Sequence, residues 1–395
     1  MSRPPLEVAD IVRAQGSRFI ENNRHWIYWV HQKVLRALMR CRTAALGGHR
    51  DQCPGCGYRT ISYNSCRNRH CPKCQAAARQ RWLVARQQEL LAVGYFHLVF
   101  TLPHQLSPLA LQNKKVVYDL LFRSSAQALL QVADDPDHLG AEAGFLSVLH
   151  TWGQNLLHHP HIHCVIPAGG LAPDHTRWIH PRYPFLVPVK VLSRVFRGKF
   201  VAGLKGRFRQ GQLIFVGSLQ PLSDPKAFAS FLRTLFRQDW VVYAKPPFGG
   251  PERVLRYLAR YTHRVAISNH RLLTFENDQV TFFWKDYTHG NKKRKMTLSS
   301  QEFLRRFLLH VLPRGFVRIR FFGFLAPRRR TKLLPLCRRL LADHPRPYAP
   351  DRGTSSTEGP VCFRCPYCGT RMVIRERFSP LDSLSGIRRT PFDTS

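Results

Sequence analysis

Hydrophobic positions along the chain follow both helical and extended patterns. In residues 6–46, apolar side chains including Ile11, Phe19 and Val34 recur at near-helical spacing, which predicts helices. Other segments with a helical pattern are 76–91, 107–157, 192–205, 225–236 and 299–311, and segments with a strand pattern are 96–102, 161–167, 213–216, 264–268, 271–275, 280–284 and 316–322. Because helices and strands alternate between about residue 92 and residue 325, we expect a mixed α+β domain there.

Composition adds a strong positive charge to this picture. Hydrophobic residues make up 44% of the 395 residues, enough for a sizeable core, which excludes a disordered chain. The 61 Lys and Arg residues outnumber the 24 Asp and Glu residues, for a formal net charge of +37. Such an excess opposes compaction unless a polyanion neutralises it. We therefore expect DNA as the partner, bound in a salt-dependent way, and no nucleotide cofactor.

The hydrophobic pattern also bears on where the protein works. No apolar run is long enough to span a bilayer, and the first ten residues lack a hydrophobic signal core. The 11 cysteines cluster in Cys-x-x-Cys pairs, which favours metal thiolates in a reducing compartment over disulfides. We expect a cytoplasmic, nucleoid-associated protein with no membrane partner.

Two cysteine pairs predict a structural zinc site. Cys53-Pro-Gly-Cys56 and Cys71-Pro-Lys-Cys74 are separated by residues 57–70. Zinc prefers four soft ligands in a tetrahedron, and each Cys-x-x-Cys turn supplies two of them. We therefore expect Cys53, Cys56, Cys71 and Cys74 to bind zinc together. Three surplus candidates could replace a cysteine or build a second site: His49, Cys66 and His70.

The cysteine-rich segment is followed much later by a second one. Cys365-Pro-Tyr-Cys368 is only half a zinc site, to which Cys362 could add one ligand. It lies beyond a stretch rich in Pro, Ser, Thr and Gly, at 343–360, which is typical of a linker. The chain thus divides into an N-terminal helical and zinc-binding domain at 1–91, an α+β domain at 92–330, and a basic stretch, linker and tail at 331–395.

A histidine pair predicts a second kind of metal site. His161-Ile162-His163 lies in an apolar, β-branched segment that predicts a buried strand. Side chains alternate faces along a strand, so the two imidazoles point the same way and can hold one metal ion. A divalent ion there would polarise a non-bridging oxygen of a phosphodiester. The pattern leaves the third ligand unidentified, with His159 as a candidate by alternation.

A tyrosine pair supplies candidate nucleophiles. Tyr257 and Tyr261 lie four residues apart on a predicted helix, so they share a helix face. A tyrosine hydroxyl, with a pKa of about 10, needs a positive field to attack a phosphodiester. The metal ion, Arg260 and Arg264 could provide that field. Together with His161 and His163, the tyrosines predict DNA cleavage through a phosphotyrosine bond.

Basic and aromatic side chains interleave at several other places. Near Trp284 the chain carries Lys292, Lys293 and Arg294, and cationic groups beside stacking surfaces suit single-stranded DNA. Arg67 and Arg69 beside the cysteine pairs are further candidates for phosphate contacts. The alternatives are that these charges are solvated faces over a core, and that the cysteine-rich module is a structural clip.

At these residues the chain resembles the two-tyrosine HUH transposases of rolling-circle insertion sequences, with their N-terminal transposase zinc-binding domain. The matching stretches are Cys41–Thr43, Leu46–His49, Asn64–Pro72, His159–Pro167, Tyr257–Asn269, Glu302–Phe307 and His310–Pro313. The resemblance implies an HUH endonuclease fold, in which a central antiparallel sheet flanked by helices carries His161 and His163. It also implies Tyr257 and Tyr261 as nucleophiles, Mg²⁺ or Mn²⁺ as the working ion, and action at the ends of an insertion element.

Two other functions remain open. A plasmid rolling-circle replication initiator or relaxase would use the same chemistry, and a non-catalytic zinc regulator would bind DNA without any covalent intermediate. A cut-and-paste transposase with an acidic metal triad is disfavoured, because no paired carboxylate motif occurs at a strand–helix junction.

Overall fold

The computed structural model describes residues 4–245, 266–286, 290, 292–343 and 363–380. The chain divides into two compact units. Unit 1 comprises Met1–Ala77, Ile267–Val311 and Arg352–Ser395, and unit 2 comprises Ala78–Ala266 and Leu312–Asp351. This grouping cuts across the three consecutive domains expected from the sequence, because residues 267–311 cluster with the N-terminal segment.

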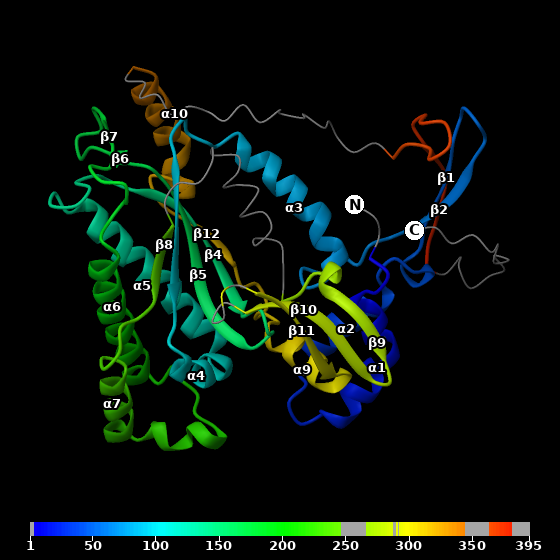
Figure 1. Cartoon of the computed structure of the whole chain (residues 1–395), viewed down its shortest axis with the longest axis horizontal. Coiled ribbons are helices and arrows are strands. Elements are labelled where there is room, and N and C mark those ends of the chain that lie inside the picture. Colours follow the sequence, from blue (N-terminus) through cyan, green and yellow to red (C-terminus); the bar gives the residue numbers. More distant parts are fainter. Residues whose placement is uncertain (1–3, 246–265, 287–289, 291, 344–362, 381–395) are drawn as a thin grey trace. The chain divides into compact units, whose positions relative to one another are not determined.

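Unit 2 is built on a five-stranded sheet with the strand order β12–β4–β5–β3–β8 (Figure 1). Its strands are β3 (Tyr95–Thr101), β4 (Gly144–Trp152), β5 (His158–Pro167), β8 (Val242–Lys245) and β12 (Ile319–Gly323). Every neighbouring pair of strands is antiparallel. The predicted α+β fold with a central antiparallel sheet is therefore confirmed.

Helices and one small hairpin complete unit 2. Among the described residues, its α-helices are α4 (Ser107–Gln112), α5 (Lys114–Asp134), α6 (Val189–Arg209), α7 (Pro225–Thr234) and α10 (Pro327–Asp343). Helix α3 (Pro72–Gln87) leads into the unit. The hairpin consists of β6 (Gly170–Leu171) and β7 (Trp178–Ile179). None of the helices described for this chain is long and apolar enough to cross a membrane.

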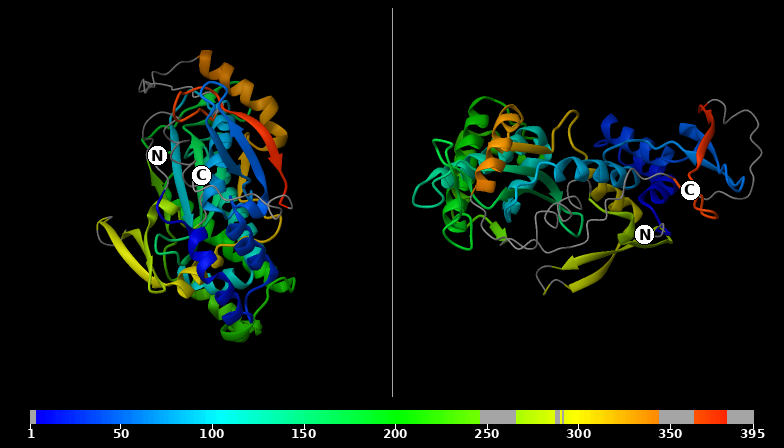
Figure 2. Two further views of the ribbon diagram at one scale, coloured as in Figure 1. Left: turned by 90° about the vertical axis from the view of Figure 1, so that its right-hand side faces the viewer. Right: turned by 90° about the horizontal axis from the view of Figure 1, so that it is seen from above.

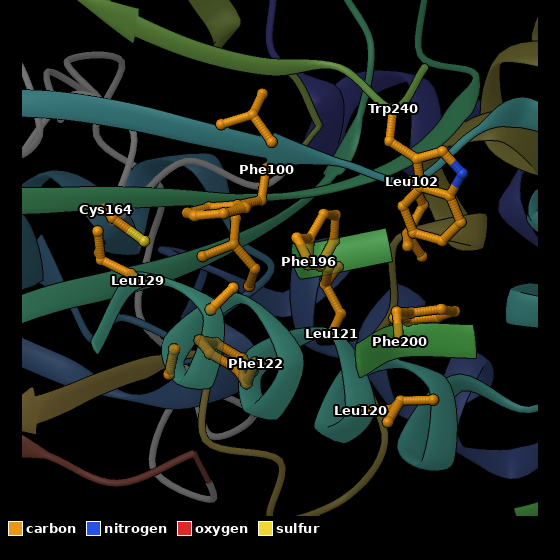
Figure 3. Close-up of a cluster of buried hydrophobic side chains, with 14 of the residues drawn as sticks. Phe100, Leu102, Leu120, Leu121, Phe122, Leu129, Cys164, Phe196, Phe200 and Trp240 are labelled. Atoms are coloured by element: carbon orange, nitrogen blue, oxygen red, sulfur yellow. The ribbon is translucent and has the colours of Figure 1, made fainter. Parts of the chain in front are cut away.

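One face of the sheet carries the main hydrophobic core. Alternate residues of β3 and β5, including Leu98, Phe100 and Cys164, point to this face and are buried. Helices α5 and α6 cover it with aromatic side chains, among them Phe122 and Phe196 (Figure 3). Fully burying side chains of this size stabilises the fold by about 1.5–3 kcal/mol each. The core therefore fixes the register of the strands that carry the histidines.

The opposite face of the same sheet is divided between apolar and polar residues. At one end, Val165 and Leu146 pack with Leu334 of α10 in a second hydrophobic cluster. Towards the other end, the positions that share this face are the histidines of β4 and β5. This face of the sheet therefore carries a group of imidazoles beside a cluster of buried apolar side chains.

The described part of unit 1 contains two small sheets and three α-helices. The first sheet has the order β13–β1–β2, from β1 (Gly48–Gln52), β2 (Arg59–Tyr63) and β13 (Val373–Phe378), and the second has the order β11–β10–β9, from β9 (Leu272–Glu276), β10 (Gln279–Asp286) and β11 (Lys292–Ser299). The helices are α1 (Val8–Asn22), α2 (Trp29–Arg40) and α9 (Ser300–Leu309). Helix α1 packs against both other helices, and its Val8 amide donates a hydrogen bond to Asn269 Oδ1 at 3.2 Å. Figure 2 shows β10 and β11 extending as a hairpin away from the helices of this unit.

The structure corrects several expected elements. Residues 144–152, expected to be helical, form β4, an inner strand of the sheet between β12 and β5. Eight of its nine residues are buried, so the strand lacks the alternation that distinguishes it from a buried helix. Residues 213–216 form no strand, because the side chain of Asn113 bonds the backbone of Ile214 instead. Residues 292–299, interpreted only as a basic segment, form β11.

Candidate metal centre and zinc clusters

Three histidines converge on one face of the central sheet. His150 comes from β4, and His161 and His163 come from β5. The register of these strands places His150 directly opposite His161. One ligand atom from each of the three lies within 4.8 Å of the others, a spacing that one metal ion could bridge. His150 is thus the candidate for the third ligand that the sequence pattern had left unidentified, and it was missed because β4 was taken for helix.

The ring nitrogens of the predicted pair are oriented by neighbouring groups. His161 donates a hydrogen bond from Nδ1 to the backbone carbonyl of His159 at 2.7 Å, which leaves Nε2 as the ring nitrogen that could bind a metal ion. Nδ1 of His163 lies 2.8 Å from Nε2 of His97 on the neighbouring strand β3. Such outer contacts fix the tautomer and the ring orientation of metal-binding histidines. His159 acts here through its carbonyl and does not belong to the group of three.

Burial keeps the imidazoles of His161 and His163 neutral. His150 is 2% exposed and His163 is 7% exposed. Burial lowers the pKa of His161 to about 3, with a further contribution from His159, and it lowers the pKa of His163 well below its ordinary value. A neutral imidazole keeps the lone pair that a metal ion requires. His161 and His163 therefore offer nitrogen ligands across the whole neutral pH range.

The predicted nucleophiles Tyr257 and Tyr261 lie outside the described residues, and so do Arg260 and Arg264. Their roles stay predictions.

The cysteines expected to form one zinc site belong to two clusters. Cys71 and Cys74 lie with Cys41 and Cys66, whereas Cys53 and Cys56 lie with Cys365 and Cys368. The expected set of Cys53, Cys56, Cys71 and Cys74 is therefore not brought together. The reason is the β1–β2 hairpin, since Cys53 and Cys56 occupy its turn while Cys41 and Cys66 flank its open end. A strand of five residues separates the two ends by roughly 16 Å.

The first cluster is formed wholly by the N-terminal segment. The Sγ atom of Cys74 lies 3.6 Å from that of Cys41 and 3.5 Å from that of Cys66, and Cys71 Sγ lies 3.6 Å from Cys41 Sγ. Hydrogen bonds among the thiols lower the pKa of Cys41 and Cys74 and raise the pKa of Cys66 and Cys71. Thiolates are the form of cysteine that binds metals, so this cluster suits a four-sulfur zinc site.

Neither candidate histidine belongs to a cysteine cluster. His49 Nε2 lies 3.4 Å from Asp51 Oδ2, and His70 Nδ1 lies 3.2 Å from Asn68 Oδ1. Both clusters described by the structure consist of cysteines alone. Of the three surplus candidates, only Cys66 is brought to a cluster.

The basic residues singled out in the sequence are largely exposed. Lys292, Lys293 and Arg294 line up on β11 with exposed side chains. The Lys293 ammonium lies 3.5 Å from the centroid of the Phe283 ring on β10. In the zinc-binding segment, Arg67 is exposed, while burial lowers the pKa of Arg69.

Comparison with known proteins places the chain in a family. Residues 11–102 match the IS91-type family model described as "Transposase zinc-binding domain", and residues 144–332 match one described as "Putative transposase". The "Putative transposase y4qJ" of Sinorhizobium fredii is 54% identical over 341 residues, which cover 86% of this chain and 85% of that protein. The chain belongs to the IS91-type transposase family. The "Transposase for insertion sequence element IS801" of Pseudomonas savastanoi pv. phaseolicola is 27% identical to this transposase over 383 residues, 91% of this chain and 88% of the relative.

These matches confirm the family resemblance and the nature of the partner. The IS91-type transposase acts on DNA, and its zinc-binding domain and cysteine clusters support structural zinc. The three clustered histidines all lie within the matched transposase region, and Cys41, Cys66, Cys71 and Cys74 all lie within the matched zinc-binding region. No solved structure matches the chain.

Proposed function

We propose that this transposase cleaves and rejoins single-stranded DNA at the ends of its insertion element, through a 5′-phosphotyrosine intermediate of rolling-circle transposition. The observation that carries the proposal is the convergence of His150, His161 and His163 on one rigid sheet face. The three rings are largely buried, and neighbouring groups orient the two from β5. Such pre-organisation suits the binding of one catalytic metal ion.

The donor set bears on which ion the site takes. Three imidazole nitrogens suit a transition-metal ion, whereas Mg²⁺ prefers oxygen ligands and retains several waters. Between Mg²⁺ and Mn²⁺, the site therefore favours Mn²⁺. When bound, the ion would offset negative charge on a non-bridging phosphate oxygen. The histidines themselves hold its position and, being neutral, add no positive charge that would repel it.

The proposed nucleophiles are Tyr257 and Tyr261. A tyrosine oxygen attacks the phosphorus, its proton passes to solvent, and the bond from phosphorus to the 3′ oxygen breaks. The 3′ oxygen takes up a proton and leaves as a hydroxyl, while the 5′ phosphate stays bound to the tyrosine. Because the phosphodiester energy is retained in the new bond, a 3′-hydroxyl can reverse the reaction on another strand without ATP. Two tyrosines allow two such cleavages in succession.

We also propose that the β10–β11 hairpin contacts DNA. Lys292, Lys293 and Arg294 are exposed in a row on β11, and Arg294 also forms an ion pair with Asp286 of β10 at 3.3 Å. Lys293 lies over the Phe283 ring, so the hairpin combines cations with an aromatic surface. Both features suit the phosphates and bases of a single strand.

Formation of a covalent adduct tests the chemistry. The purified chain is incubated with single-stranded oligonucleotides carrying the element ends and with Mn²⁺ or Mg²⁺, and a denaturing gel resolves protein bound to DNA. We expect an adduct with the wild-type chain and none with the Tyr257→Phe, Tyr261→Phe double variant. The His161→Ala, His163→Ala variant should also lose the adduct, whereas His104→Ala, at an exposed histidine, should keep it.

The same experiment separates the alternatives. Both relatives reported above are named transposases, which favours transposition over a plasmid initiator or relaxase. A non-catalytic zinc regulator would bind the oligonucleotides without any adduct. Persistence of the adduct in the double tyrosine variant would remove Tyr257 and Tyr261 as nucleophiles.

A further inference from the structure

We propose that Cys53, Cys56, Cys365 and Cys368 form a second zinc site, which joins the C-terminal segment to the zinc-binding domain. The four thiols are grouped within one unit of the structure. The matched zinc-binding region ends at residue 102, so two of the four ligands lie far outside it. This site is independent of the DNA chemistry proposed above.

The first half of the site is a turn between β1 and β2. The amide of Cys53 donates to the Tyr58 carbonyl at 2.8 Å, and the Gly57 amide donates to the Cys53 carbonyl at 3.0 Å. Gly57 has a φ of 75°, which favours glycine. The Cys56 amide points at Cys53 Sγ from 3.5 Å, a contact that stabilises a thiolate. These features describe a tight knuckle that presents two thiols on one side.

The second half repeats this geometry near the other end of the chain. The amide of Cys365 donates to the Thr370 carbonyl at 2.8 Å, and the Gly369 amide donates to the Cys365 carbonyl at 3.0 Å. Gly369 has a φ of 72°, close to that of Gly57. The sequences Cys-Pro-Gly-Cys-Gly and Cys-Pro-Tyr-Cys-Gly share the proline and the final glycine. Two equivalent knuckles that face each other are what a tetrahedral four-cysteine site requires.

The distances between the thiols fit a shared ion. Cys53 Sγ lies 3.3 Å from Cys368 Sγ, and Cys56 Sγ lies 3.5 Å from Cys365 Sγ. With zinc–sulfur bonds of about 2.3 Å, the edge of a regular tetrahedron is roughly 3.8 Å. A disulfide would instead bring two sulfurs to about 2.05 Å. The observed spacing is therefore closer to that of zinc ligands than to that of oxidised pairs.

Residues other than the four cysteines also bring the two knuckles into close contact. A Cβ atom at Gly55 would lie 2.9 Å from Thr370 Oγ1, so a larger residue would push the knuckles apart. The rings of Tyr58 and Tyr367 meet at 4.8 Å beside the thiols. Cys53, Cys365 and Met372 form a small buried cluster against Tyr58. The two halves of the site thus contact each other through side chains other than the ligands.

The pairing of β1 with β13 adds contacts between the zinc-binding domain and the C-terminal segment beyond those of the thiols. The two strands are antiparallel from Gly48 opposite Phe378 to Gln52 opposite Val373. Arg50 and Glu376 form an ion pair across them at 2.9 Å. Because a small sheet with few buried apolar residues is weakly stable alone, a zinc ion at its end would supply much of its stability. We therefore infer that zinc binding keeps β13 paired with β1.

Metal content tests the site directly. Elemental analysis of the purified full chain should find two zinc ions per chain, one for each cysteine cluster. The Cys365→Ser, Cys368→Ser variant should retain one. The matched control is Cys337→Ser, at a buried cysteine of α10 outside both clusters, and it should retain two. A wild-type chain with one zinc ion, or a double variant that keeps two, would overturn the proposal.

Two further measurements guard against a variant that simply misfolds. X-ray absorption at the zinc edge of the wild-type chain should show four sulfur ligands per ion at about 2.3 Å, and nitrogen or oxygen ligands would contradict two four-cysteine sites. Hydrogen exchange should show that the double variant loses amide protection in β13 but keeps it in the β9–β11 sheet. Retained protection of β13 in the variant would show that zinc does not hold this strand.

Discussion

His97 Nε2 lies 2.8 Å from Nδ1 of His163, across the boundary between β3 and β5. For His163 to offer Nε2 to a metal ion, its Nδ1 must carry the proton and donate a hydrogen bond to Nε2 of His97. His97 is 3% exposed, and burial lowers its pKa to about 4, so it stays neutral and can accept this hydrogen bond. We therefore propose that His97 is a positioning residue for the candidate metal site, acting through His163.

Removing this contact should weaken metal binding. We expect His97→Ala to raise the Mn²⁺ concentration for half-maximal adduct formation by about 10–100-fold, as for other outer-shell partners of metal ligands. Excess Mn²⁺ should restore most of the activity, which a purely structural defect would not allow. His97→Gln, whose amide oxygen can accept the same hydrogen bond, should lie between wild type and His97→Ala. An unchanged Mn²⁺ requirement in His97→Ala would contradict the positioning role.

Replacing His150 should damage the site more severely. His150→Ala removes one of three ligands, so we expect adduct formation to fall by at least about 100-fold in limiting Mn²⁺. His150→Asp keeps a ligand atom of a type that Mg²⁺ prefers, and should therefore shift the preference from Mn²⁺ towards Mg²⁺. Adduct yields measured over a titration of each ion would reveal the shift. Wild-type ion dependence in both variants would exclude His150 as a ligand.

The sequence predicted much of this site because local patterns determine it. His161 and His163 share a face by strand alternation alone, and β3 and β5 each carry an apolar pattern typical of strands. His150 could not be found in this way, since β4 is buried on both faces and its pattern does not separate strand from helix. Its place opposite His161 depends on strand pairing, which no local pattern specifies.

The zinc clusters show the same limit at longer range. The four cysteines Cys53, Cys56, Cys71 and Cys74 have the spacing of one site, and this spacing does not separate the two pairs. The β1–β2 hairpin carries Cys53 and Cys56 at its turn, whereas Cys71 and Cys74 lie beyond its open end. Cys53 and Cys56 are grouped instead with Cys365 and Cys368. One signal was present in the sequence: each of those pairs is followed by a glycine, whereas Cys74 is followed by Gln75.

Burial of the imidazoles predicts a pH dependence of stability. In the unfolded chain a histidine has a pKa of about 6.5, whereas in the folded metal-free chain the pKa of His97 is about 4 and that of His161 about 3. Between pH 6.5 and about 4 the unfolded state binds protons that the folded state does not, so stability falls as the pH falls. Each group contributes a slope of up to about 1.4 kcal/mol per pH unit.

Amide hydrogen exchange in β5 measures this slope without divalent metal ions. We expect the free energy of opening to decrease from pH 7 to pH 5, and to decrease less in the His97→Gln, His161→Asn variant. Acid also protonates the zinc thiolates, but it does so equally in variant and wild type, so the difference isolates the two imidazoles. His104→Ala should follow the wild-type slope, and a parallel decline in all three chains would contradict the prediction.

The β10–β11 hairpin should contribute to DNA binding in a way that salt reveals. Each phosphate contact releases a counterion, and for single strands the slope of log affinity against log salt changes by about 0.7 per contact. The variant Lys292→Gln, Lys293→Gln, Arg294→Gln should therefore bind an element-end oligonucleotide with a slope shallower by about 2. Fluorescence anisotropy over a range of NaCl concentrations would measure both the affinity and the slope.

A matched control separates the hairpin from the overall charge. Lys115→Gln, Lys190→Gln, Lys226→Gln also removes three exposed positive charges, but from helices α5, α6 and α7. Lost long-range attraction from a net charge of +37 would weaken binding in both variants alike, because it depends on the total charge. Direct contacts act within a few ångströms and change the slope only where the phosphates lie. Equal slopes in the two triple variants would therefore show that the hairpin is a solvated face, and a shallower slope in the hairpin variant alone would place the strand along β11.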